Sequence, residues 1–293
     1  YVIPIIEALQ KNLDLKLVVT TESPAFAKAT AGRAKPNLAL QGDALQSYPV
    51  VKYCVENKIP YLSVQNLKDQ NTKYKIQNTK APVAVLADFG LIIPKEILNV
   101  FPKGIINIHP SLLPKYRGPT PVQTAILNGD KVTGVSIMKV DEKIDHGPIL
   151  SQKKEKILDT DTSESLYKKL FDKGATLLSK TIGLYLEGKL KPTAQNHVKA
   201  TFTQPLSRQD GFVDLSTTNY KLLTANLKKM IRAYYPWPSV WSKLDVSSQK
   251  LAVRIKFLPG NLIQVEGKKP ISYKDFLNGY PEAKEMLSKI TPS

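Results

Sequence analysis

Short apolar segments alternate with helical segments through the first half of this 293-residue chain. The strand-like segments are rich in Val, Ile and Leu, and they lie at 15–20, 60–64, 83–87, 104–109 and 135–140. Helical patterns lie beside them at 5–13, 44–57, 94–100 and 121–129. This alternation predicts an α/β fold whose sheet is mostly parallel and covered by helices on both faces. The chain is also long enough for a second, smaller domain.

Two polar residues, Asn107 and His109, end the fourth of these strands. They lie two positions apart, so they point to the same face of the strand. Pro110 then ends the strand because it has no amide hydrogen for the ladder. Both side chains are therefore expected at the carboxyl edge of a strand, where open α/β sheets bind ligands. Taken singly, a histidine before proline and an isolated asparagine are more often turn residues.

A dense set of motifs around these residues favours a site. The stretch 107–150 resembles the folate-dependent formyltransferase family, which carries Asn-x-His, a Ser-Leu-Leu-Pro loop and a later Asp-x-Gly. The matching residues are Asn107, His109, Ser111-Leu112-Leu113-Pro114, Arg117-Gly118, Gly129-Asp130, Thr133-Gly134-Val135 and the run 141–150, which includes Asp145-His146-Gly147. The number of matches in one contiguous stretch makes a functional site the better interpretation than a set of turn residues.

The resemblance implies a Rossmann-like formyltransferase sheet and a reaction in which 10-formyltetrahydrofolate, as co-substrate, gives its formyl group to an amine. It assigns catalysis to Asn107, His109 and Asp145. Asn107 would donate hydrogen bonds to the oxyanion, a protonated His109 would add a charged donor, and Asp145 would take the amine proton through water. The positions that match the folate-binding segments are Asp88, Phe89, Gly90, Ser111, Leu112, Leu113, Pro114 and Asp141. No metal is expected, because the three histidines and one cysteine are scattered.

A long amphipathic helix is predicted over 163–188. Thr162 or Ser163 can cap its start, and Gly188 can close its end. The apolar stripe is formed by Leu166, Leu170, Leu177, Leu178 and Ile182. The polar run 189–206 has no sustained period and predicts a linker. His197 lies in that run, and we expect it to be exposed and without a partner set.

The last part of the chain resembles the C-terminal domain of methionyl-tRNA formyltransferases, a small OB-like β-barrel. The residues that carry the resemblance are 231–238 (Ile-Arg-Ala-Tyr-Tyr-Pro-Trp-Pro), 268–270 and 273–277. The stretch between them is short, so we expect an abbreviated barrel. The predicted organisation is a catalytic domain at 1–190, a linker at 191–206 and an OB-like tRNA-binding domain at 207–293. Tyr234, Tyr235 and Trp237 could form the core of the small domain, and for Trp237 we prefer that interpretation.

The chain is strongly basic, with 42 Lys and Arg against 25 Asp and Glu, or +17. Such a charge favours a polyanionic partner, although a lysine-rich proteome would explain it equally well. The resemblance implies methionyl-tRNA as that partner. The long loop at 21–47 matches the family's basic RNA-binding loop at Arg33 and Lys35. Lys228, Lys229 and Arg232 span one turn of a predicted helix at 219–233 and are further candidates for RNA contact, against the commoner alternative of a solvated helix face.

Several features bear on the setting of the protein. The single cysteine, Cys54, excludes an intramolecular disulfide and fits a reducing cytosol, and we expect it to be buried. No apolar run reaches the roughly 20 residues that span a bilayer, and no signal peptide is recognisable, so we expect a cytoplasmic protein without membrane contact. We also expect a monomer, although no feature of the sequence sets the oligomeric state. The family opens with an apolar strand before the first helix, and we expect that central strand to be missing here.

Three functions fit these patterns. The first is formylation of methionyl-tRNA in translation initiation, favoured by the basic C-terminal domain. The second is formylation of a small amine such as an amino-sugar nucleotide or glycinamide ribonucleotide, which would use the same Asn107, His109 and Asp145 but needs no basic domain. The third is a non-catalytic RNA-binding relative, which the intact set of three residues argues against.

Overall fold

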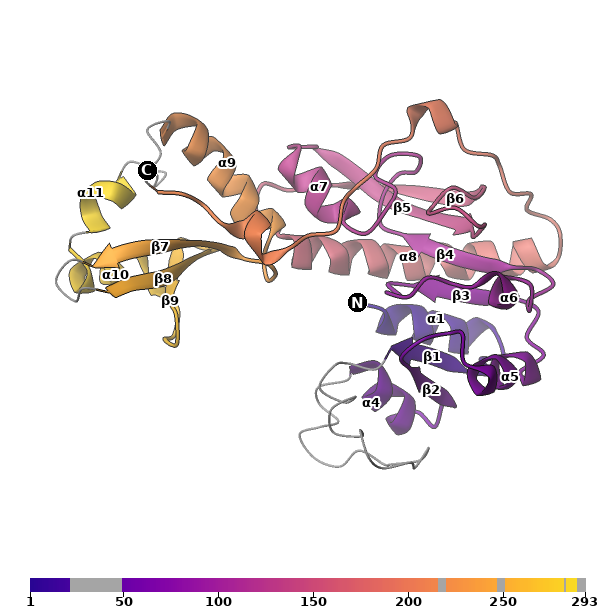
Figure 1. Ribbon diagram of the computed structural model, residues 1–293. Coiled ribbons are helices and arrows are strands. Elements are labelled where there is room, and N and C mark those ends of the chain that lie inside the picture. Colours follow the sequence, from indigo (N-terminus) through magenta and orange to yellow (C-terminus); the bar gives the residue numbers. More distant parts are fainter. Residues whose placement is uncertain (22–48, 216–219, 247–250, 282, 289–293) are drawn as a thin grey trace. The chain divides into compact units, whose positions relative to one another are not determined.

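The computed structural model describes residues 1–21, 49–215, 220–246, 251–281 and 283–288, and these form two compact units (Figure 1). Unit 1 comprises Tyr1–His109, Val135–Lys153 and Phe171–Val198. Unit 2 comprises Pro110–Gly134, Lys154–Leu170 and Lys199–Ser293. The chain passes several times between the units. This division differs from the predicted one, in which a single linker at 191–206 separates two domains. The domain limits given above remain predictions.

Two sheets lie mostly in unit 1. β1 (Val18–Thr21) pairs in parallel with β2 (Tyr61–Val64). The second sheet has the order β3 (Ala84–Ala87), β4 (Ile105–His109), β5 (Val132–Lys139) and β6 (Ile149–Lys156). In this sheet β3 and β4 are parallel, whereas β4 and β5 are antiparallel. The α/β class with a parallel-rich arrangement is confirmed, and the strand β6 is an addition that the polar run 152–156 did not suggest.

Helix α1 (Ile3–Asn12) precedes β1, and α4 (Pro49–Glu56), α5 (Gln70–Asn78) and α6 (Lys95–Leu98) lie between successive strands from β1 to β4. α5 was not predicted, because its sequence is mostly polar. It begins at a side-chain cap, since the Asp69 carboxylate accepts a hydrogen bond of 2.8 Å from the Thr72 amide. Cys54 is fully buried on α4, as expected, and burial raises the pKa of its thiol to about 11. Cys54 therefore acts as a buried packing residue.

An apolar cavity of about 680 Å³ separates the two sheets of unit 1. β1 and β3 both line it, together with the start of α1 at Tyr1 and Val2. Among the described residues no further strand pairs with the second edge of β1 or of β3. The residues of both strands are only half-buried, which is unusual for parallel strands. The described strands therefore do not form one continuous sheet.

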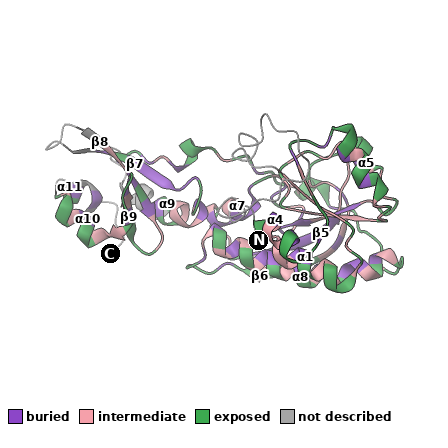
Figure 2. Cartoon of the chain, turned by 90° about the horizontal axis from the view of Figure 1, so that it is seen from below, coloured by how far each residue is buried: buried purple, intermediate pink, exposed green. Residues whose placement is uncertain are grey.

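The long helix α8 (Ser163–Leu186) follows the predicted pattern. Thr162 caps it, because its Oγ1 accepts from the Ser165 amide at 3.2 Å. Four residues of the predicted stripe are fully buried and Leu177 is half-buried, so the helix alternates between buried and exposed surface (Figure 2). Gly174 allows the helix to approach β4 closely, since a Cβ there would stand 2.9 Å from Ile108 Cγ2. Gly188 ends the segment with φ +75°, as a C-cap glycine does.

In unit 2, helices pack with an antiparallel sheet around one apolar core. The helices are α7 (Pro121–Leu127), α9 (Tyr220–Ala233), α10 (Tyr273–Gly279) and α11 (Ala283–Ser288), with a short 3-10 turn at Arg208–Gly211. A second 3-10 turn, at His197–Lys199, lies where the chain leaves unit 1. The sheet has the order β10 (Ile271–Ser272), β9 (Leu262–Val265), β8 (Leu251–Leu258) and β7 (Val240–Val246). Its described strands do not close into a barrel, so the OB-like architecture is not confirmed beyond this antiparallel sheet.

The aromatic residues after α9 differ in burial, and Trp237 is not where the sequence predicted it. Tyr234 is buried, with 8% of its surface exposed, so the core position left open for it is the one it takes. Trp237 is 53% exposed, so the preference for a core position was wrong. Trp241 takes the interior place instead, and its Nε1 donates a 2.9 Å hydrogen bond to the Arg208 carbonyl. Trp237 lies between Pro236 and Pro238 in the turn that leads to β7, and there it remains outside the core.

Part of the predicted linker is held against the loop that follows β4. The Arg117 amide donates to the Thr201 carbonyl at 2.8 Å, and the Thr203 amide donates to the Arg117 carbonyl at 2.7 Å. The Thr120 amide donates in turn to Thr203 Oγ1 at 3.1 Å. Residues 201–203 therefore act as an ordered extended segment of unit 2.

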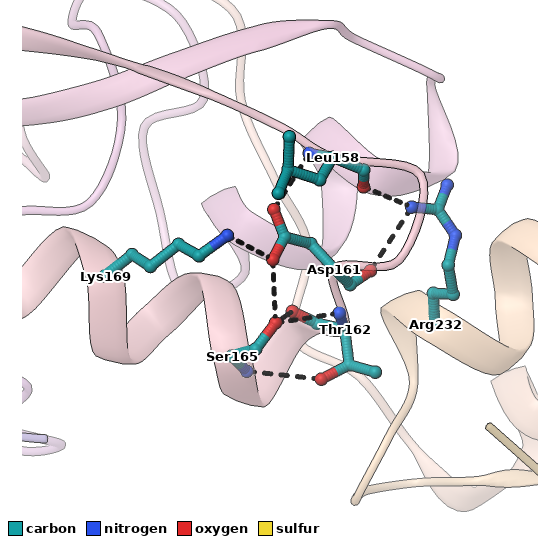
Figure 3. A network of polar contacts seen from close by, with 6 residues as sticks. All are labelled: Leu158, Asp161, Thr162, Ser165, Lys169 and Arg232. Atoms are coloured by element: carbon teal, nitrogen blue, oxygen red, sulfur yellow. Dashed lines mark hydrogen bonds and ion pairs between the residues drawn. The ribbon is translucent and has the colours of Figure 1, made fainter. Parts of the chain in front are cut away.

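Asp161 organises the turn before α8 (Figure 3). Its carboxylate accepts from Lys169 Nζ at 2.6 Å, from Ser165 Oγ at 3.0 Å and from the Leu158 amide at 2.8 Å. Arg232 on α9 donates through Nη1 to the carbonyls of Leu158 and Asp161, at 3.0 and 3.2 Å. Burial by itself would raise the pKa of Asp161, but the hydrogen bonds from Lys169, Leu158 and Ser165 hold it below its ordinary value.

We predict that Asp161→Asn lowers the free energy of unfolding by about 2 kcal/mol at neutral pH, because a buried, charge-assisted network loses its charge. A carboxyl whose folded pKa is depressed stabilises the fold above its unfolded pKa, and that stability is lost as the pH falls through the folded pKa. The difference between the two proteins should therefore shrink below pH 4, near the ordinary Asp value of 3.8. Denaturant titrations at several pH values measure it. Asp159→Asn, which removes an exposed ion pair with Lys131, is the matched control and should change little.

Candidate active site

Asn107 and His109 lie on β4, an interior strand with β3 on one side and β5 on the other. Asn107 stands opposite Met138 of β5, and His109 stands opposite Ser136. His109 is buried, with 4% of its surface exposed, and Asn107 is half-buried. Ile106 and Ile108, which alternate with these two residues along the strand, are fully buried on its other face. The alternation of the strand therefore places both polar side chains on one face, as the sequence predicts.

The structure brings Asp145 to these two side chains. Asn107 Nδ2 donates a hydrogen bond of 3.2 Å to Asp145 Oδ1. His109 Nδ1 lies 3.6 Å from the same oxygen, within ion-pair distance. The side chains of His109 and Asp145 are 5% and 14% exposed, so water has little access to them. An amide, an imidazole and a carboxylate thus meet at one point that is poorly solvated, where electrostatic interactions are strong.

The loop that carries Asp145 is held in a restrictive conformation. Asp145 has φ +47°, a left-handed backbone that few side chains adopt. At Gly147 an added Cβ would stand 1.9 Å from the Lys139 carbonyl oxygen, so only glycine fits there. The buried side chain of Gln195 donates through Nε2 to the carbonyls of Asp145 and Gly147, at 2.9 and 2.7 Å. Gln195 was missed by the sequence analysis, because a glutamine in a polar run gives no signal of its partners.

A histidine pair lies next to this loop. His146 Nδ1 is 2.7 Å from Asp141 Oδ2, and its ring stacks on His197 at 4.0 Å between centroids with an interplanar angle of 1°. His197 is exposed, as expected, but the expectation that it has no partner was wrong. The other carboxylate oxygen of Asp141 accepts from the Lys143 amide at 3.0 Å. Asp141, expected in folate binding, therefore uses both oxygens to shape its own loop.

Four further folate candidates form the loop after β4, within unit 2. Ser111 is fully buried and its Oγ donates to the Lys115 carbonyl at 2.6 Å. Leu113 is buried, whereas Leu112 and Pro114 are half-buried. The Leu113–Pro114 peptide bond is cis. The loop is thus a compact turn, in which the Leu112 carbonyl accepts from the Lys115 amide at 3.1 Å and the Pro114 carbonyl accepts from the Thr201 amide at 3.3 Å.

The other folate candidates follow β3. Asp88 is exposed with φ +48°, and Phe89 packs among the apolar residues of that part of unit 1. Gly90 is exposed, and no atom lies within 4 Å of the place where its Cβ would stand. No neighbouring atom of the described chain requires a glycine there, so the position leaves open space beside the backbone.

The proposed RNA-binding cations are in different situations. Arg33 and Lys35 lie outside the described residues. On α9, Lys228 is exposed and Lys229 half-exposed. Arg232 is half-buried and holds the Leu158 and Asp161 carbonyls, as described above. Lys228 and Lys229 are thus the more accessible cations of this helix turn.

Comparisons with known proteins decide the family. The sequence pattern of the family described as formyl transferase matches residues 25–182, which is more than half of the chain. The chain belongs to the formyl transferase family. A methionyl-tRNA formyltransferase of Thermodesulfovibrio yellowstonii is 34% identical over 264 residues, which is 82% of this chain and 83% of the relative. A methionyl-tRNA formyltransferase of Buchnera aphidicola subsp. Schizaphis graminum is 39% identical over 198 residues. That match covers 68% of this chain but only 62% of the relative's length.

Solved formyltransferases share the fold. The methionyl-tRNA formyltransferase from Clostridium thermocellum superposes with a TM-score of 0.52 at 20% identity, over 87% of this chain and 95% of that chain. In this formyltransferase, the described residues contain no cluster of three or more His, Cys, Asp and Glu that could hold a metal ion. Among the helices described, none is long and apolar enough to cross a membrane.

We predict that Gly147→Ala displaces the Asp145 loop and destabilises the formyltransferase, because the new methyl group would overlap the Lys139 carbonyl. The expected loss is about 2 kcal/mol or more in the free energy of unfolding. Gly183→Ala on α8 is the matched control, since nothing lies within 4 Å of its Cβ position and alanine favours a helix. Thermal unfolding of both variants measures the effect. A melting temperature for Gly147→Ala equal to that of the parent would mean that the loop is not confined as described.

Proposed function

We propose that this protein transfers the formyl group of 10-formyltetrahydrofolate to the α-amino group of methionyl-tRNA. The observation that carries the proposal is the convergence of Asn107 and His109 on Asp145 Oδ1, at 3.2 and 3.6 Å, in a poorly solvated site. The family, and relatives named methionyl-tRNA formyltransferase, support the choice of reaction and acceptor.

Each of the three residues has a role that its contacts support. The amine attacks the formyl carbon, and the carbonyl oxygen becomes an oxyanion. The Asn107 amide has two N–H groups, of which one is directed to Asp145, so the other can donate to that oxyanion. His109 presents Nδ1 toward Asp145 Oδ1 at 3.6 Å, and we assign its imidazole to proton transfer with the reacting groups. Asp145 fixes the orientation of both.

The proton balance assigns the remaining steps. The attacking amine becomes cationic in the tetrahedral intermediate and must lose one proton, which Asp145 can accept directly or through water. The C–N bond to the folate then breaks, and the folate nitrogen leaves with a proton that His109 can supply. One proton is thus taken up and one released in each turnover, and no redox change occurs. The low exposure of His109 and Asp145 limits competing hydrolysis of the formyl donor.

Folate is proposed to bind at the residues that match the folate-binding segments of the family. Gly90, with open space beside its backbone, is the candidate for main-chain contact with the pterin ring. Ser111, Leu112, Leu113 and Pro114 are retained as candidates because they match the family motif. Asp88 and Phe89 complete this side of the proposed site. Asp141 contributes through the conformation of its loop, because both of its carboxylate oxygens already have partners.

The RNA is proposed to contact the basic loop with Arg33 and Lys35, and the C-terminal domain, for which we retain the OB-like architecture as a proposal. Lys228 and Lys229 are its candidate phosphate contacts, while Arg232 contributes mainly by holding the turn at Asp161. The net charge of +17 supports a polyanionic partner. The proposed reaction belongs to translation initiation in the cytoplasm, carried out by a monomer.

We predict that the parent formylates charged initiator tRNA, and that His109→Ala and Asp145→Ala each lower kcat by at least about a hundredfold, as loss of an acid–base group does. The assay follows transfer of labelled formyl groups, with an amino-sugar nucleotide and glycinamide ribonucleotide as competing acceptors. Circular dichroism checks that each variant is folded. A preference for a small amine would replace methionyl-tRNA as the acceptor, and near-parental kcat in a folded variant would remove that residue from the catalytic set.

A second prediction concerns α9. Lys228→Glu/Lys229→Glu should weaken tRNA binding and reduce its salt dependence. With fewer phosphates neutralised by the protein, fewer counterions are released from the tRNA on binding. Lys153→Glu/Lys154→Glu on β6 changes the net charge equally and is the matched control. Binding is measured by filter retention over a series of salt concentrations. An unchanged salt slope in the α9 variant would show that this helix turn does not touch the RNA.

A further inference from the structure

A small pocket lies beside Trp237 in unit 2. Its volume is about 210 Å³, and it is formed by the turn after α9, the strands β7 to β9 and the 3-10 turn at Arg208. The residues that line it include Arg208, Trp237, Trp241, Arg254, Lys256 and Gln264. No residue of the proposed catalytic site, and neither lysine of α9, belongs to it.

Trp237 is the unusual member of this lining. It exposes 53% of its surface, although a tryptophan has more apolar area to bury than any other residue. The neighbouring prolines restrict the backbone on both sides, so the indole ring is held at the pocket with little freedom of the main chain. Such an exposed, restrained aromatic ring is a surface on which a flat ring can stack.

Positively charged side chains line the same pocket as Trp237. Arg208 and Lys256 are exposed at the pocket, and Arg254 lies with its guanidinium 5.1 Å above the Trp241 ring. Arg254 is paired through Nη1 with Glu266 at 2.8 Å, while its buried Nε has no hydrogen-bond partner. With Glu266 also in the lining, three cations face one carboxylate. A ligand with an anionic group is therefore favoured.

We propose that this pocket binds one unpaired nucleotide of an RNA, with the base stacked on Trp237 and the phosphate held by Arg208 and Lys256. A stacking aromatic with flanking cations is the combination by which proteins hold single-stranded nucleic acid. The pocket is smaller than the roughly 300–1,000 Å³ of typical small-molecule sites, so it admits a single base rather than a whole cofactor. The inference adds a contact to the proposed function and rests on it for the identity of the RNA.

The test measures binding of a short labelled single-stranded RNA to the full chain by fluorescence anisotropy, without folate or a methionyl group. Trp237→Ala should weaken binding roughly fivefold to a hundredfold, the usual effect of losing one stacked base. Trp237→Phe, which keeps an aromatic face, should recover most of the affinity. Tyr74→Ala removes another exposed aromatic ring, on α5, and should leave binding unchanged.

A second measurement uses the intrinsic fluorescence of the protein. Stacking of a base should quench the emission of the parent, and in Trp237→Ala, where Trp241 alone remains, that quenching should disappear. Lys256→Ala should lower the salt dependence of binding by about one phosphate contact. Equal affinity of Trp237→Ala and the parent for the RNA would overturn the proposal. Because these assays need no formyl transfer, a failure of the proposed reaction would show separately, as absent formylation by the parent.

Discussion

The arrangement of the catalytic site depends on the strand β4, which is buried on both faces. Ile106 and Ile108 fill one face, where Gly174 lets α8 approach within contact of Ile108. This packing leaves the other face for Asn107 and His109, which the pleat then presents together. Pairing with β3 on one side and β5 on the other prevents the strand from shifting, because a slip by one residue would exchange the two faces. The polar groups are thus positioned by an apolar constraint.

The carboxylate of Asp145 is positioned in a different way. Asp145 belongs to a loop, and its place is set by backbone geometry at Asp145 and Gly147 and by the two hydrogen bonds from Gln195. Fifty residues of chain separate Gln195 from Asp145. Gln195 is remote in sequence from the loop that it orients. Functional sites generally need such support from residues that do not touch the substrate. The rigidity of the site therefore depends on the segment 193–197 as well as on the sheet.

Much of the fold could be predicted from local sequence, and the failures have physical reasons. The five strands and α8 with its Thr162 cap and Gly188 were predictable because apolar periodicity and capping residues are local signals. The polar helix α5 and the strand β6 were missed, since neither has an apolar periodicity. Trp237 was placed in a core because sequence cannot show that Trp241 takes the interior position. The convergence of Asn107, His109 and Asp145 was expected from motif resemblance, whereas the contacts of Gln195, His146 and Arg232 depend on tertiary structure alone.

The apolar cavity between β1 and β3 has a consequence for how the protein behaves in solution. Both strands line it, together with apolar residues such as Ile5, Leu67 and Ile97. Accessible apolar surface of this kind attracts other apolar surface, including that of another molecule of the same protein. The charge of +17 opposes this, because like-charged molecules repel one another at low ionic strength. Added salt screens that repulsion without weakening apolar contact. Colloidal stability should therefore be greatest in dilute buffer, and salt, which frees the protein from nucleic acid, should bring its molecules together.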